Sequence, residues 1–453
     1  MTNFDVIEAY IQDFTVWQKH DGKVIVSNNK AIVKANTPFS GNWIISNNKK
    51  FEIGKIKVTG LDSNIGNNFL SYSYYNKDGN RIIIRIKKDG IYEFPNNEYD
   101  AEAGFHCNSS LTFSNDIIIE QLPTSILKDY SGNRHDAYLY GFKGRLNSGV
   151  GIYKIDFSKT LNLSAFDNFE RLNNKVIAKG NYSGNWNVFG EYDINGIVKN
   201  KVTIKITGLN NIKEKLSLEY GYYTTDSKYI KNIILIDKDG IYTYDLNDII
   251  IPDESNIAHT IYNRMYFGER IINDINLIVE EIPDYSNQLC YDGKSYGVAY
   301  DMPILTDYTV MAERTILDNS DIADWAFIAK RDYPAINGAF TFEKDIDDTS
   351  DNLRTISFGR TSVIYNPIKE RSISYQTKNK YNGQDIIVGN VDDVDFLLIG
   401  AGILDTNLNL VKEKMRVAHG NILLFNRSLT EYEISWVKNN MMCSKPQEPD
   451  IDL

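Results

Sequence analysis

The residues of this chain that could do chemistry are its carboxylates, and their spacing limits what they could do. A glycoside hydrolase needs two carboxyl groups that face one scissile bond. On a strand, such a pair is usually written as ExDxE, and the only match, Glu98–Glu102, follows a Pro- and Asn-rich stretch rather than lying in a predicted strand. The acidic runs Glu343–Asp348 and Val391–Asp395 have the wrong spacing or lack the Glu pair. We therefore predict that the protein is not an enzyme.

Histidine, cysteine and glycine also lack the spacings of catalytic or metal motifs. No two of the five histidines lie four residues apart, and none has Cys or Glu at metal-ligand spacing. The three cysteines are far apart and form no CxxC, which predicts buried thiols rather than a disulfide framework. No Gly-rich phosphate loop is present.

Aromatic rings are the remaining functional groups, because the C–H face of a sugar stacks on Tyr or Trp. Tyr333, Tyr375 and Tyr381 lie in polar stretches of the last third of the chain. We expect these three side chains to be exposed in loops and take them as the candidate ligand-binding residues.

Composition excludes some classes of partner. The net charge is −11, and Lys and Arg are scattered rather than clustered. Nucleic-acid binding needs a basic stripe, so we expect no nucleic-acid partner. No run approaches the ~18 apolar residues of a membrane span, so we also expect no membrane insertion. The first residues do not resemble a signal peptide, and we expect synthesis in a bacterial cytoplasm.

The first two thirds of the chain contain an internal sequence repeat. SGNW occurs at Ser40–Trp43 and at Ser183–Trp186, and both copies continue with an IKxTGL and a KDGIY phrase. An internal repeat of this length predicts two homologous domains. Because Trp43 and Trp186 match between the copies, we interpret both as core residues.

Local patterns predict strands almost everywhere. Runs of β-branched and aromatic residues alternate with Asn-, Gly- and Asp-rich turns, as in an antiparallel sandwich. We read the KDG that ends at Gly90 as a hairpin turn. The segment Phe4–Phe14 fits either one helical face or an edge strand. Near the C-terminus, Thr430 and Glu433 form a capping box that predicts a short helix with Trp436 in the core.

Three phrases resemble a known family. One phrase, NILLFNRSLTEYEISWV at residues 421–437, resembles the closing strand and helix of concanavalin A-like (laminin G-type) lectin domains. YDGKSYGVAYDMPILTDYTVMAER resembles the opening of that family, and DYSGNRHDAYLYGF resembles the phrase that precedes it. The whole arrangement is similar to multi-domain proteins of tailed phages that infect gut Bacteroidales.

The resemblance implies a two-sheet jelly roll, carbohydrate binding and a calcium site between loops. The acidic loop with Asp345, Asp347 and Asp348 is the candidate for that site, and Val391–Asp395 is a second one. Solvated acidic loops are the alternative interpretation of both.

The predicted architecture is all-β, with three parts. Residues 1–124 form a first β-sandwich repeat, and residues 125–284 form a connecting strand and a second repeat, which we consider as an insertion into the lectin-like domain. Residues 285–453 form a concanavalin A-like jelly roll with one terminal helix.

These features predict a virion structural protein, that is, a head or tail fibre, a decoration protein or a baseplate component. It would assemble with itself and with other virion proteins and bind a host surface glycan. A bacterial surface adhesin is the alternative, and a glycan-cleaving enzyme is a third.

Overall fold

The structure is a computed structural model, and it is built almost entirely of strands. It describes residues 6, 8–19, 23–36, 39–46, 50–61, 70–111, 113–144, 146–154, 157, 169–172, 175–179, 182–186, 191–192, 201–209, 216–223, 226, 228–245, 261–271, 276–317, 319, 325–333, 338–345, 352–365, 370–389, 392–405 and 410–442. Within these residues the all-β prediction is confirmed, with antiparallel sheets and one α-helix.

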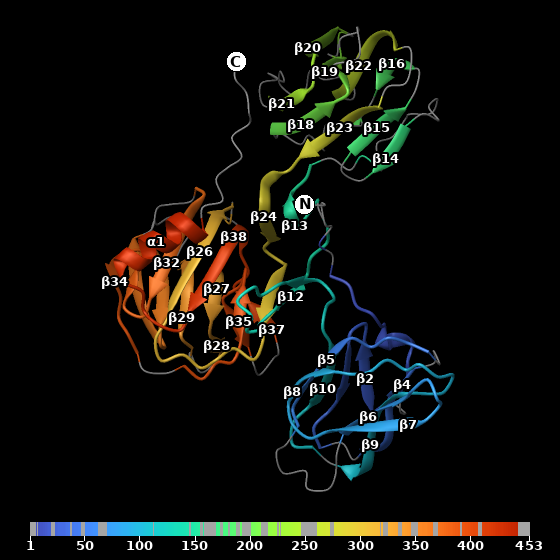
Figure 1. Ribbon diagram of the computed structural model, residues 1–453, viewed down its shortest axis with the longest axis vertical. Helices are drawn as coiled ribbons and strands as arrows, with labels where there is room; N and C mark the ends of the chain where they lie inside the picture. The colour runs from blue at the N-terminus through green and yellow to red at the C-terminus, as the bar shows by residue number, and fades with distance from the viewer. Residues whose placement is uncertain are drawn as a thin grey trace.

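The first part of the chain is a sandwich of two five-stranded sheets, in the orders β1-β4-β9-β6-β7 and β2-β3-β10-β5-β8 (Figure 1). Its strands are β1 (Gln18–Lys19), β2 (Val24–Ser27), β3 (Lys30–Val33), β4 (Phe39–Ile45), β5 (Lys55–Thr59), β6 (Leu70–Tyr75), β7 (Arg81–Ile86), β8 (Gly90–Glu93), β9 (Gly104–Leu111) and β10 (Ile117–Gln121). Alternate residues of β5 are buried, as a half-buried strand requires. Trp43 is fully buried in the core between the sheets, so its predicted role is confirmed.

The prediction of a hairpin at Gly90 is wrong. β7 pairs with β6 and β8 pairs with β5, so the KDG turn carries the chain from one sheet to the other. The carboxylate of Asp89 accepts hydrogen bonds from the amides of Gly60 (3.0 Å) and Leu61 (2.7 Å). These bonds fasten the crossing to the end of β5.

A second pair of sheets has the orders β14-β15-β23-β18-β21 and β16-β22-β19-β20, with β17 beside β22. Its strands are β14 (Phe169–Leu172), β15 (Lys175–Lys179), β16 (Tyr182–Trp186), β17 (Glu191–Tyr192), β18 (Lys201–Thr207), β19 (Leu216–Tyr223), β20 (Tyr229–Ile236), β21 (Gly240–Asp245), β22 (Ile261–Ile271) and β23 (Asn276–Ile282). Asp239 accepts a 2.6 Å hydrogen bond from the amide of Leu209, as Asp89 does from Leu61. The side chain of Trp186 lies outside the described residues.

The last part of the chain contains an eight-stranded sheet, β11-β12-β25-β35-β27-β29-β30-β31, and a seven-stranded sheet, β13-β24-β38-β26-β32-β33-β34. A small third sheet has the order β28-β36-β37. The strands are β11 (Ile126–Leu127), β12 (Ala137–Tyr140), β13 (Gly149–Ile152), β24 (Asp284–Asp292), β25 (Tyr296–Ala299), β26 (Thr309–Ile316), β27 (Ala326–Lys330), β28 (Asp332–Tyr333), β29 (Phe340–Asp345), β30 (Asn352–Ser357), β31 (Arg360–Tyr365), β32 (Ser372–Thr377), β33 (Lys380–Tyr381), β34 (Gln384–Asp385), β35 (Leu397–Ile399), β36 (Ile403–Asp405), β37 (Leu410–Lys412) and β38 (Arg416–Phe425).

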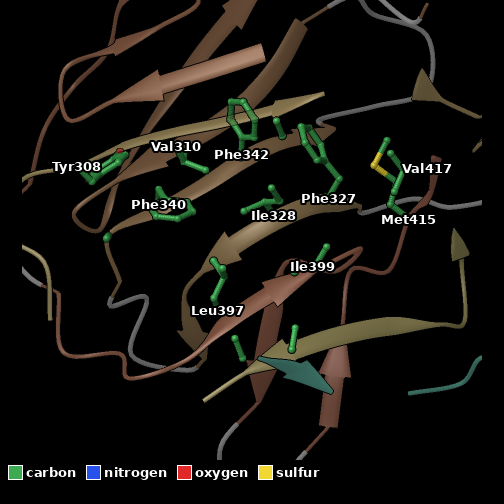
Figure 2. Close-up of a cluster of buried hydrophobic side chains, with 14 of the residues drawn as sticks. Tyr308, Val310, Phe327, Ile328, Phe340, Phe342, Leu397, Ile399, Met415 and Val417 are labelled. Carbon is green, nitrogen blue, oxygen red and sulfur yellow. The ribbon is translucent and has the colours of Figure 1, made fainter. Parts of the chain in front are cut away.

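The two large sheets pack around one apolar core, part of which is drawn in Figure 2. Phe327 and Ile399 enter this core from the eight-stranded sheet, and Val310 and Val417 enter it from the seven-stranded sheet. β35 is a central strand, because it lies between β25 and β27. The group that approaches Gly400 most closely is the ring of Tyr291.

Strands from before and after the second sandwich meet in the large sheets. β12 pairs with β25, and β13 pairs with β24. The chain therefore leaves the C-terminal sheets after β13, forms the second sandwich and returns through β24, which continues directly from β23 (Figure 1).

The first sandwich contacts the outer face of the eight-stranded sheet. All four residues of β12 are buried, because Ala137 and Leu139 face the inner core and Tyr138 and Tyr140 face a second apolar cluster outside it. Lys57, on the first sandwich, places its ammonium group 4.1 Å from the ring centroid of Tyr300. Burial of Lys57 lowers the pKa of its ammonium group.

The described residues 8–13 of the N-terminal segment form neither the helix nor the edge strand that its pattern suggested. The amide of Glu8 donates to the carbonyl of Phe142, and the amide of Thr124 donates to the carbonyl of Ala9. Residues 8–13 belong to no helix or strand, and a 3₁₀ turn follows at Phe14–Val16. An isolated helix of this length is marginal, so bonds to the rest of the chain replace its own.

The terminal helix α1 (Glu431–Met441) begins as predicted. Thr430 accepts from the amide of Glu433, and the Glu433 carboxylate accepts from the amide of Thr430, which completes the capping box. Ile434 and Val437 are the buried helix residues. The prediction that Trp436 is core is wrong, because its side chain is 53% exposed.

Candidate binding surface

Tyr333 lies at the surface, where a ligand can reach it. It ends β28, and its side chain is 43% exposed. β28 runs parallel to β36, with Tyr333 beside Asp405, and Asp405 lies beside Leu410 of β37. Because partners in register point to the same face of a sheet, these three side chains share one face.

An ion pair lies on the same face. Lys412 Nζ is 2.7 Å from Asp405 Oδ2 and 5.2 Å from the ring centroid of Tyr333. The side chain of Asp405 is almost fully buried, whereas that of Lys412 is partly exposed. A buried carboxylate therefore holds the lysine in place beside the ring.

The other face of the small sheet anchors it. Leu404 and Val411 are buried in the same apolar cluster as Tyr138 and Tyr140. Alternation along the strands sends these side chains inward and leaves Tyr333 and Lys412 outward. The small sheet is thus a fixed support rather than a loose loop.

This arrangement can bind a sugar without reacting with it. An exposed phenol ring stacks on the C–H face of a pyranose, and an ammonium group donates hydrogen bonds to hydroxyl groups. We call Tyr333, Asp405 and Lys412 the Tyr333 site. Tyr333 was predicted from the sequence, but the other two were not. Asp405 and Lys412 end the short runs Ile403–Asp405 and Leu410–Lys412, and no sequence pattern shows that these two runs pair.

Tyr375 and Tyr381 are not exposed, so that part of the prediction is wrong. Tyr381 is fully buried and packs on Phe342, with 5.4 Å between ring centroids. Tyr375 lies under α1, where its hydroxyl donates to Glu431 at 3.0 Å. Burial and this bond raise the pKa of Tyr375 to about 12. Buried rings have no open face for a sugar.

The acidic loop proposed for calcium falls largely outside the described residues. Asp347 and Asp348 are not described, and Asp345 is placed only as the last residue of β29. In the part of the chain that the structure describes, no three His, Cys, Asp or Glu side chains gather as a metal site would require.

The second acidic run contains a buried ion pair. Lys330 Nζ lies 2.6 Å from Asp392 Oδ2, and both side chains are fully buried. Asp392 also accepts from the amide of Leu305 at 2.7 Å, and Lys330 also donates to the carbonyl of Val394. Asp392 is therefore neither a solvated loop residue nor an open metal ligand, because its oxygens already have partners.

Searches against protein families, curated proteins and solved structures found no match. Among the described residues, no helix is both long and apolar enough to cross a membrane.

Proposed function

We propose that this chain is a structural component of a phage particle, such as a head or tail fibre, a decoration protein or a baseplate part, and that it binds a host glycan. The observation that carries the glycan-binding role is the Tyr333 site, in which an exposed ring and a held lysine lie on an anchored sheet. The fold alone does not imply this function, so the site is the main support.

In this proposal, the two N-terminal sandwiches are copies of one domain. Their shared strand order and the matching Asp89 and Asp239 contacts support a duplication. The third sandwich is then a concanavalin A-like jelly roll into which the second copy is inserted. The pairing of β13 with β24 around that copy supports the insertion.

Exposed edge strands support assembly. β7 and β20 occupy equivalent edges of the two sandwiches, and both expose apolar side chains, namely Ile83, Ile233 and Leu235. An edge strand with exposed apolar side chains pairs readily with another chain unless it is covered. Symmetric assembly or seating on a shell would cover both edges.

Binding tests the glycan role directly. An array of immobilised neutral and acidic oligosaccharides is probed with the full chain, with Tyr333→Ala and with Tyr333→Phe. We expect Tyr333→Ala to weaken binding and Tyr333→Phe to retain most of it, because the ring does the stacking. Tyr99→Ala, which removes an exposed ring from the first sandwich, is the matched control. Equal binding by Tyr333→Ala and the control would refute the role of this site.

Location tests the structural role. Antibodies against the purified chain are applied to phage particles and to uninfected cells and viewed by electron microscopy. Label on particles supports the proposal, and label confined to the cell envelope favours the adhesin instead. We also expect no release of reducing ends from host capsule. Release that a single Asp or Glu substitution abolishes would contradict a non-catalytic role.

A further inference from the structure

Helix α1 carries two exposed aromatic side chains on its outer side. Tyr432 is 79% exposed and Trp436 is 53% exposed. Residues four apart lie on the same face of a helix, about 6 Å apart along its axis. The two rings therefore form one short aromatic strip, which we call the helix strip.

The helix strip is held rigidly. Ile434 and Val437 are buried against Met311 and Leu429, and the capping box closes the first turn. At the other end, Asn421 Nδ2 donates to the carbonyl of Met441 at 3.1 Å. A ring on a docked and capped helix loses little freedom when a ligand stacks on it.

Polar groups surround the strip, and the carboxylates among them already have partners. Ser435, Asn439 and Asn440 are exposed one turn or less from the rings, and Asn440 Nδ2 donates to the carbonyl of Trp436 at 2.7 Å. Amides and hydroxyls both donate and accept hydrogen bonds, as the hydroxyl groups of a sugar do. Of the neighbouring carboxylates, Glu433 is paired with Arg427 at 2.7 Å, and Glu431 accepts from the hydroxyl of Tyr375.

The size of the strip favours a small occupant over a protein. A fully exposed aromatic side chain offers about 150–250 Å², so the exposed fractions of Tyr432 and Trp436 correspond to about 300 Å² of accessible aromatic surface. A stable protein partner needs about 800 Å² on each side. The strip matches two adjacent rings of an oligosaccharide.

We propose that Tyr432 and Trp436 form a second carbohydrate-binding platform, specific for a neutral oligosaccharide. The proposal rests on the glycan-binding role proposed above, but it does not depend on the Tyr333 site. Sequence reasoning missed the platform because it placed Trp436 in the core.

Tryptophan fluorescence reports on this platform selectively. Among the tryptophans whose side chains are described, Trp17, Trp43 and Trp325 are buried and Trp436 is exposed. Acrylamide quenching of the full chain, compared with Trp436→Phe, isolates the signal of Trp436. We expect the free protein to show a strongly quenched Trp436 component. A Trp436 that acrylamide does not reach would mean that the strip is covered, and the proposal would fail.

The probes are hexasaccharides of glucose, mannose, xylose and galactose, added one at a time. We expect at least one to protect Trp436 from acrylamide, and Trp436→Ala to weaken its binding roughly tenfold or more, as for a central aromatic contact. Tyr432→Ala should weaken the same probe less. Tyr130→Ala, which removes a more exposed ring from a distant turn, is the control and should change nothing.

The outcomes separate the two proposals. If Tyr333→Ala abolishes binding of a probe and the Tyr432/Trp436 double variant does not, the glycan role stands and the platform is refuted. If no hexasaccharide binds at all, the platform is refuted, and the array of neutral and acidic oligosaccharides decides the glycan role. Thermal unfolding of Trp436→Ala should match the parent protein, because the side chain is not part of the core.

Discussion

Breaking the buried ion pair between Lys330 and Asp392 should destabilise the C-terminal part of the chain strongly. Asp392→Ala leaves an ammonium group with no carboxylate in a fully buried position and removes the acceptor of the Leu305 amide. Removing one partner of a buried pair costs about 3–5 kcal/mol. Lys330→Met should cost a similar amount, because it strands the carboxylate instead.

A surface pair provides the matched comparison. Lys34 and Asp116 are also 2.6 Å apart, but their side chains are 57% and 36% exposed. Water screens this pair, so Lys34→Met should cost less than about 1 kcal/mol. Equal distances with unequal burial therefore isolate the effect of desolvation.

Urea denaturation of the parent chain and of the variants Asp392→Ala, Lys330→Met and Lys34→Met measures these losses of stability. Because the chain has several parts, each variant is compared with the parent on the transition of the part that carries the substitution. The double variant Lys330→Met/Asp392→Leu should be more stable than either single variant, because no charge stays unpaired. If Asp392→Ala costs no more than Lys34→Met, the argument from burial is refuted.

The remaining predictions concern the cap, pH and assembly. Thr430→Ala should cost about 0.5–2 kcal/mol in denaturation, and an unchanged midpoint would show that the cap does not contribute. Burial lowers the pKa of His419 to about 3, so the unfolded chain takes up the proton first. The stability that neutral His419 contributes is therefore fully present above pH 6.5 and is lost as the pH falls, by about 3 kcal/mol at pH 4. The substitution His419→Gln should reduce this dependence of stability on pH. Light scattering should detect oligomers that the double variant Ile83→Lys/Leu235→Lys disrupts; a parent chain that is monomeric at tens of micromolar would contradict assembly.

The local features of this protein could be predicted from its sequence. The strand-rich composition and the capping box of Thr430 depend on neighbours along the chain, and both are confirmed. The burial of Trp43, predicted from its match with Trp186 in the repeat, is confirmed as well. The exposed Tyr333 was also found in this way, because polar residues surround it.

Contacts between distant segments were beyond the reach of the same reasoning. Only the positions of α1 and the core show that Tyr375 and Tyr381 are buried and that Trp436 is not. Likewise, Lys412 approaches Tyr333 only because β36 and β37 pair beside β28.

The sequence by itself determined which segments are strands and where the terminal helix begins, because short-range periodicity and side chain–backbone hydrogen bonds set these features. Tertiary structure alone decided which sheet each strand joins. The KDG turn before β8 shows the reason, because a turn of that composition serves a hairpin or a crossing between sheets equally well. The choice depends on the Asp89 contact with the end of β5 and on the apolar faces that the two sheets bury against each other.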